Sequence, residues 1–177
     1  MSNAVKGFTL IELMMTLAIA AILLTVAVPS FQSFTQNSRL TKQVNLLAAT
    51  ISTARGEAAK RAVNVVVCQT NEPTAATPAC NGTSGTWSDG WVVFADADGD
   101  VTVDAASDVV AAFQTESGVN LLTDAGTEVV FKPDGSTTEG TTVTFAICDS
   151  RGVNHGKKLD VATTGRASSS DATTCTP

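Results

Sequence analysis

The sequence predicts an α+β protein in which a long N-terminal helix precedes a head of antiparallel β-sheet, arranged as a β-sandwich. Three patterns lead to this fold class. A 21-residue run from Phe8 to Val28 is apolar apart from one acidic residue. Apolar residues then recur at helical spacing between Leu40 and Ala58, and short β-branched runs separated by turn residues begin at Asn64. We therefore expect a helix over 8–62 and a head over 63–177.

Charge divides the chain at the same point. Up to Arg61 there are six basic and two acidic residues, whereas from Ala62 onward five basic residues face fifteen acidic ones. A head this acidic repels polyanions overall, so nucleic-acid binding requires a local basic patch that works against the global field.

The apolar run over 8–28 is long enough to cross a bilayer. As a helix rising about 1.5 Å per residue it spans roughly 30 Å, the thickness of the hydrocarbon core. An ordinary secretory signal places its cleavage site after the apolar stretch. Here the candidate site, Gly7, precedes it, so cleavage removes a leader over 1–7 and leaves the anchor on the mature protein. Lys6 on the leader is consistent with a cytoplasmic N-terminus.

Glu12 is the one charged residue in this apolar run. A carboxylate within a membrane span is energetically costly unless it is neutralised or paired. Two interpretations are open: Glu12 snorkels to the membrane edge, or it has a specific cationic partner.

The helix is expected to continue beyond the apolar run. Pro29 predicts a bend, because its ring removes one backbone hydrogen bond. The spacing of the following apolar residues places them on one helix face: Leu40, Val44, Leu47, Ile51, Ala54 and Ala58. A coiled coil is the alternative, but the repeat lasts under three heptads and ends in alanines, so we expect the face to pack into the head.

Strands are expected in the head at 64–68, 90–95, 108–113, 119–122, 128–131, 142–148 and 158–161. A low-complexity loop over 72–85 separates the first two.

Four cysteines lie in the head, and no two are spaced as a CxxC pair. A zinc site of four thiolates normally needs two close pairs, so the spacing favours disulfides formed in an oxidising compartment. Four cysteines allow three pairings. Sequence proximity favours Cys68 with Cys80 and Cys148 with Cys175.

The segment 6–13, KGFTLIEL, resembles the prepilin processing motif of type IV pilins and type II secretion pseudopilins. The resemblance implies that a prepilin peptidase cleaves after Gly7 and that Phe8 is then N-methylated. It also implies that Glu12 meets the positively charged N-terminus of a neighbouring subunit. The implied location is the inner membrane, with the head periplasmic, and later a pilus or pseudopilus filament. The implied partners are other pilins or pseudopilins and the inner-membrane assembly platform.

Four head segments, at 87–100, 131–135, 145–149 and 164–166, resemble the FimT/FimU/GspH group of minor pilins and pseudopilins. The resemblance implies a pilin-like fold with the long helix packed beneath the head. It also implies a minor type IV pilin, a low-abundance structural subunit in pilus assembly initiation or at the pilus tip. The alternative is a minor pseudopilin of a type II secretion system.

An acidic cluster in the head is a candidate calcium site: Asp96, Asp98, Asp100 and Asp104. The EF-hand pattern is not met, because Gly99 stands at the fourth position and Ser107 at the twelfth. A hairpin turn with solvated acidic side chains explains the cluster at least as well.

A set of basic residues near the C-terminus is a candidate DNA-binding site: Arg151, Lys157, Lys158 and Arg166. In some members of the resembled group a Gly-Arg-Ala-Arg ending is implicated in DNA capture during natural transformation. Here the match stops at Ala167, and Ser168 replaces the second arginine, which weakens such a site. The alternative is an ordinary solvated edge strand.

The sequence does not predict an enzyme or a cofactor. Its sole histidine, His155, lies in an expected turn, and no nucleophile motif accompanies it.

Overall fold

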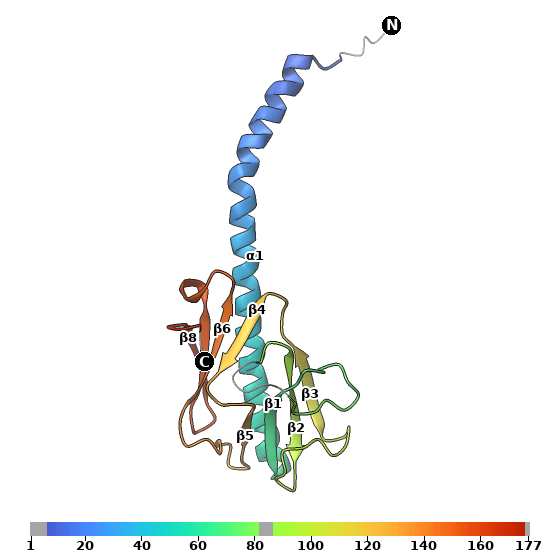
Figure 1. The fold of residues 1–177 in the computed structure, drawn as a ribbon, viewed down its shortest axis with the longest axis vertical. Helices are drawn as coiled ribbons and strands as arrows, with labels where there is room; N and C mark the ends of the chain where they lie inside the picture. The colour runs from blue at the N-terminus through green and yellow to red at the C-terminus, as the bar shows by residue number, and fades with distance from the viewer. Residues whose placement is uncertain (1–6, 82–86, 176–177) are drawn as a thin grey trace. The chain divides into compact units, whose positions relative to one another are not determined.

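The computed structural model describes residues 7–81 and 87–175 of the chain. The chain divides into two units, Met1–Asn37 and Ser38–Pro177, and one helix, α1 (Leu10–Arg61), contributes to both (Figure 1). Of the expected leader only Gly7 is described, and part of the expected loop over 72–85 also lies outside the described residues.

In the first unit, α1 exposes its apolar side chains all round. Every residue from Gly7 to Phe34 is exposed, including Leu10 at 76%, Leu24 at 58% and Phe31 at 70%. By length and composition this part of α1 is able to cross a membrane. Pro29 lies inside α1, which continues through it as a helix, and the expected bend stays a prediction.

In the second unit, the remainder of α1 packs into the head. The predicted apolar face is confirmed, because all six of its residues are buried. Thr50 is buried on the same helix, and its hydroxyl donates to the Leu46 carbonyl (2.9 Å) and accepts from Trp91 Nε1 (3.3 Å). Thr50 thus links α1 to Trp91, and its buried hydroxyl is satisfied as both donor and acceptor.

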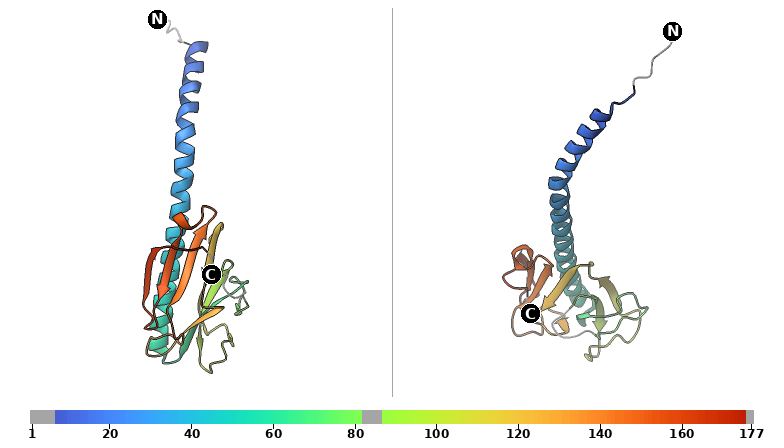
Figure 2. Two further views of the ribbon diagram at one scale, coloured as in Figure 1. Left: turned by 60° about the vertical axis from the view of Figure 1, so that its left-hand side comes forward. Right: turned by 45° about the horizontal axis from the view of Figure 1, so that its top comes forward.

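Two four-stranded antiparallel sheets complete the head, and Figures 1 and 2 show both alongside the second half of α1. The first has the order β3-β2-β1-β5, with strands β1 (Asn64–Gln69), β2 (Gly90–Asp96), β3 (Val109–Gln114) and β5 (Glu128–Phe131). The second has the order β4-β6-β7-β8, with strands β4 (Val119–Thr123), β6 (Val143–Asp149), β7 (Lys157–Val161) and β8 (Ala167–Asp171). A short 3-10 helix, η1 (Val153–His155), joins β6 to β7.

All the predicted strands are present, each within one residue of its expected ends. The sequence does not predict β8, whose residues, ASSSD, include no β-branched residue and only one apolar residue, Ala167. This strand forms as an edge, by backbone pairing with β7 from Lys157↔Asp171 to Val161↔Ala167.

The main core lies between α1 and the two sheets. Trp87 packs edge-on against Phe145 with ring centroids 5.0 Å apart, and both are fully buried. A second apolar cluster covers the other face of the first sheet, around Val92 and Phe94. The first sheet is therefore buried on both faces, which explains the unbroken apolar sequences VVVC in β1 and WVVF in β2.

The packing of α1 predicts that two leucines of the same helix contribute differently to the free energy of unfolding. Leu47→Ala removes a fully buried side chain and should lower the free energy of unfolding by about 2–5 kcal/mol. Leu24→Ala, on the exposed part of α1, should leave it unchanged. Urea unfolding of the detergent-solubilised protein, followed by fluorescence of the buried Trp87 and Trp91, measures both. Equal stabilities of the two variants would contradict this packing.

Candidate functional site

The start of α1 is a capped segment built around Glu12. Thr9 precedes the helix, and its carbonyl accepts the first helical bond, from the Leu13 N–H (3.2 Å). The Thr9 hydroxyl accepts from the Glu12 N–H (3.3 Å), and the Glu12 carboxylate accepts from the Thr9 N–H (3.4 Å). This reciprocal pair is a capping box, so Glu12 helps to start the helix in addition to any role in assembly.

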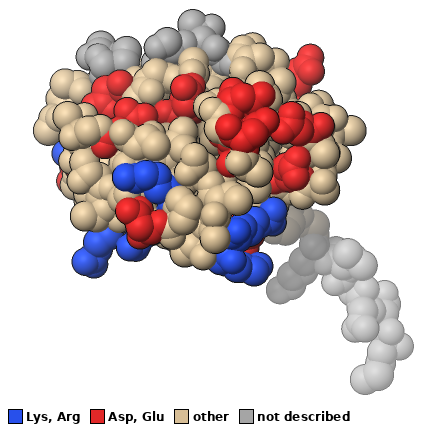
Figure 3. Space-filling model, turned by 90° about the horizontal axis from the view of Figure 1, so that it is seen from below, with Lys and Arg blue, Asp and Glu red and all other residues tan. Residues whose placement is uncertain are grey.

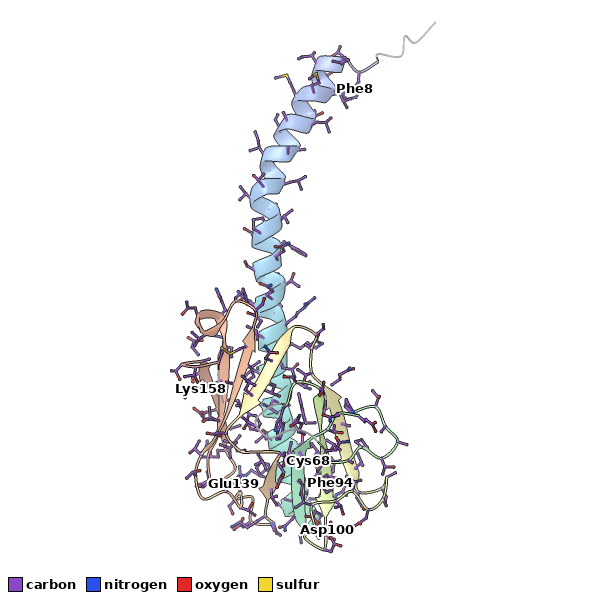
Figure 4. All side chains as sticks on the ribbon, viewed as in Figure 1. Phe8, Cys68, Phe94, Asp100, Glu139 and Lys158 are labelled. Atoms are coloured by element: carbon purple, nitrogen blue, oxygen red, sulfur yellow. A yellow bond between two sulfur atoms is a disulfide. The ribbon has the colours of Figure 1, made fainter. Side chains whose placement is uncertain are left out.

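The Glu12 carboxylate has no cationic partner among the described residues, and its bonds to Thr9 are long. Phe8, 82% exposed, lies immediately before this cap at the N-terminal end of α1 (Figure 4). The site therefore offers one carboxylate, without an ion-pair partner among the described residues, at the tip of an apolar helix. Such a charge is suited to a positive group on another molecule.

Two disulfides tie the head together: Cys68–Cys80 and Cys148–Cys175. These are the two pairs that sequence proximity favours. The first joins β1 to the long loop before β2, and the second joins β6 to the segment after β8. Each ties an irregular segment to a buried strand, which restricts the unfolded chain and stabilises the head.

The candidate calcium residues are only partly brought together. Asp96, Asp98 and Asp100 place one carboxylate oxygen each within 4.8 Å of one another, whereas Asp104 is outside this group. Asp96 is buried, and it accepts hydrogen bonds from the N–H groups of Gly99 (2.8 Å) and Val101 (3.4 Å). The buried carboxylate thus holds the loop between β2 and β3. The negative charge of Asp98, above all, raises the pKa of Asp104.

The candidate DNA-binding cations do not form one free basic patch. Arg151 pairs with Asp149 through Nη2 and Oδ2 at 2.6 Å, Lys158 pairs with Asp160 at 2.7 Å, and Lys157 pairs with Asp171. Arg166 alone of the four makes no ion pair with a described residue. His155 is exposed in η1. Three of the four charges are therefore compensated within the head, which lowers their attraction for phosphate.

An outward-facing apolar helix with a capped glutamate at its start, and a disulfide-linked β-sheet head, together define a type IV pilin-like protein. Residues 43–165 match the family described as Type II transport protein GspH, and the chain belongs to this family. Residues 2–28 match the prokaryotic N-terminal methylation motif. The predicted membership of the minor pilin and pseudopilin group is thereby confirmed.

Curated relatives match a 47-residue part of the chain. Over 47 residues it is 51% identical to "Fimbrial protein Q" and 49% identical to "Type IV major alpha-pilin", both of Moraxella bovis. It is 45% identical over 47 residues to "Fimbrial protein" of Pseudomonas aeruginosa. Each match covers 27% of this chain and 30% of the relative, so the chain spans under a third of the length of these relatives.

The fold resembles two crystal structures of the Pseudomonas aeruginosa type IV minor pilin FimU. One has a TM-score of 0.57 at 19% identity and covers 74% of this chain and 92% of that chain. The other has a TM-score of 0.58 at 20% identity and covers 76% and 90%. At these identities the likeness concerns the fold, and it confirms the pilin-like α+β architecture.

The sequence interpretation does not predict two features of the site, the capping role of Thr9 and the ion pairs of the basic residues. The capping role of Thr9 has a readable signal, because threonine followed three residues later by glutamate before an apolar run marks a helix start. The ion pairs have a weaker signal. Asp149 and Asp160 lie two residues from Arg151 and Lys158 in the sequence, whereas the partner of Lys157, Asp171, is identified only by the strand register.

The Arg151–Asp149 pair predicts a pH-dependent contribution to stability. Hydrogen bonds from Arg151 hold the pKa of Asp149 below its ordinary value, so the pair stabilises the head above about pH 4 and loses this effect as the pH falls further. Asp149→Asn should cost about 1–3 kcal/mol at neutral pH and less in acid. The exposed Asp171→Asn is the matched control and should change little. A constant effect of Asp149→Asn from neutral to acid pH, measured by urea unfolding, would contradict the assignment.

Proposed function

We propose that the protein is a minor type IV pilin, a low-abundance structural subunit that acts in pilus assembly initiation or in the tip complex. The observation that carries this proposal is the exposed apolar surface of α1 from Leu10 to Phe34, joined to a head with its own core. Water disfavours such a surface, so the helix belongs in a bilayer or among the helices of other subunits. The role is therefore structural and not enzymatic.

The proposed sequence of events starts in the inner membrane, with the N-terminus cytoplasmic and the head periplasmic. Prepilin peptidase removes the leader 1–7 after Gly7, and Phe8 becomes the N-methylated first residue. The mature protein then consists of the helix over 8–62, whose membrane half is 8–28, and the head over 63–177. At the assembly platform, the helix exchanges lipid for the helices of other major and minor pilins.

Glu12 supports this scheme on electrostatic grounds. In hydrocarbon its carboxylate lacks water, and the long hydrogen bonds from Thr9 compensate it only in part. The positively charged N-terminus of a neighbouring subunit supplies the missing charge at a point where the local dielectric is low. Pairing of the two charges favours the assembled state and sets the axial register of the helices.

The alternative is a minor pseudopilin of a type II secretion system, and the family description favours it. The similarity to fimbrial proteins over 47 residues favours the pilus. Loss of surface filaments on deletion of the gene supports the pilin. Loss of exoprotein secretion with intact filaments supports the pseudopilin.

A DNA-binding minor pilin for natural transformation is a further alternative. The one observation in its favour is Arg166, the candidate cation without an ion pair in the described part of the head. The acidic head and the compensated charges of Arg151, Lys157 and Lys158 oppose it.

Processing of the N-terminus provides the first test. Intact-mass measurement of the protein from wild-type cells should show a chain that begins at N-methylated Phe8. In cells without prepilin peptidase, the same protein should keep residues 1–7 and stay in the membrane fraction. A mature protein from wild-type cells that still carries Met1 would contradict the proposal.

Variants of Glu12 and Thr9 provide the second test. They are matched so that the effect of the Glu12 charge is separated from its effect on the helix cap. Glu12→Gln keeps an acceptor for the cap and loses the charge, whereas Thr9→Ala keeps the charge and loses the hydroxyl of the cap. We expect Glu12→Gln and Glu12→Ala to insert normally but to reach sheared filaments at least tenfold less than wild type. Thr9→Ala should assemble nearly normally.

Immunoblots of sheared filaments and membranes, compared at equal expression, measure these amounts. If Glu12→Gln assembles as well as wild type while Thr9→Ala fails, Glu12 acts through the helix cap, and the proposed charge pairing is wrong.

A further inference from the structure

A polar groove of about 430 Å³ lies in the head between α1 and two turns. One turn follows β5 and contributes Asp134 and Gly135, and the other precedes β8 and contributes Gly165 and Arg166. Arg55 comes from the second half of α1. The fold thus brings together two arginines that are far apart in the sequence.

The floor of the groove is a close contact of two turns. Gly135 and Gly165 have φ of 79° and 75°, in the left-handed region that favours glycine. A side chain on Gly165 would meet the Gly135 carbonyl oxygen at 2.1 Å, so the two backbones touch. Arg55 Nε donates to that carbonyl at 3.2 Å, which holds the guanidinium over the floor. The site is therefore positioned before any ligand arrives.

The two guanidinium groups keep unused donors. Neither Arg55 nor Arg166 makes an ion pair with a described residue, in contrast to Arg61 and Arg151. Apart from the Nε bond of Arg55, their side chains donate no hydrogen bond within the described head. Beside them Gly56, in the interior of α1, has open space where a side chain would stand. The groove thus combines free planar donors with room for an incoming chain.

The charge of Asp134 indicates which kind of anion the groove can bind. Its carboxylate accepts from the Ser136 N–H (2.8 Å) and hydroxyl (2.6 Å), which hold its pKa below the ordinary value and keep it charged. A fixed negative charge in the groove, on an acidic head, penalises a dense polyanion more than separate carboxylates. Guanidinium groups bind carboxylates through two parallel hydrogen bonds. The groove therefore suits an acidic protein segment better than a nucleic acid.

We propose that the groove between Arg55 and Arg166 docks an acidic segment on the head of a neighbouring filament subunit. This inference rests on the proposed role as a filament subunit. The head of this chain itself offers such a segment, because Asp98, Asp100 and Asp104 are exposed in the loop after β2. Figure 3 shows acidic and basic residues on different sides of one end of the head. Separated charges let successive heads meet asymmetrically, as an open filament requires.

The test measures binding of a fluorescent peptide that carries two aspartates separated by neutral residues, by anisotropy with the full-length protein in detergent at low salt. Wild type should bind this peptide, and added salt or replacement of both aspartates by asparagine should abolish binding. Arg55→Gln and Arg166→Gln should each weaken binding about fivefold, and the double variant more. Arg39→Gln, the same charge change on the same helix but outside the groove, should have no effect, and Asp134→Asn should strengthen binding.

Three results would overturn the proposal: no binding by wild type, equal binding by all variants, or tighter binding of a short single-stranded DNA through the same two arginines. Thermal unfolding of each variant checks its fold. If Arg55→Gln fails to fold, the exposed Arg166→Gln still decides the question. Incorporation of wild type into filaments is measured separately, so failure of the proposed function is distinguished from failure of this docking site.

Discussion

The apolar surface of α1 between Leu10 and Phe34 is the constraint on which the rest of the protein depends. Its side chains are exposed, and only lipid or other helices remove them from water. Both environments are apolar, so exchange of one for the other changes the hydrophobic free energy little. Packing and polar interactions therefore distinguish the two environments, and in the proposed scheme Glu12 is the polar group that favours the filament.

The same helix has a different role in the head, where its face from Leu40 to Ala58 joins two sheets in one core. The two disulfides fix irregular segments to buried strands, and most cations of the head are paired with nearby carboxylates. The Lys158 and Asp100 labels in Figure 4 mark different sides of the head. The cations without an ion pair in the described head are few, among them Arg55 and Arg166.

Local patterns in the sequence predict most of the fold. The 3.6-residue period of α1 and the β-branched runs of the head express backbone geometry directly, so the buried helix face and the main strands follow from them. β8 does not follow, because its serines carry no such signal and it forms through the Gly165 turn and pairing with β7. Likewise, the sequence suggests one basic site because Arg151, Lys157 and Lys158 lie close together in it. In the folded head, however, each of these cations forms an ion pair with an aspartate. Only the folded head brings Arg166 to Arg55.

We propose that entry into the membrane and into the filament requires the segment before Ser38, and that the head folds without this segment. The most direct measurement is thermal unfolding and membrane sedimentation of residues 38–177 exported alone to the periplasm. We expect residues 38–177 to unfold at the same temperature as the head of the full-length protein and to form both disulfides. This fragment should be absent from membranes and filaments. A fragment that fails to fold, or that still enters filaments without the apolar helix, would contradict this proposal.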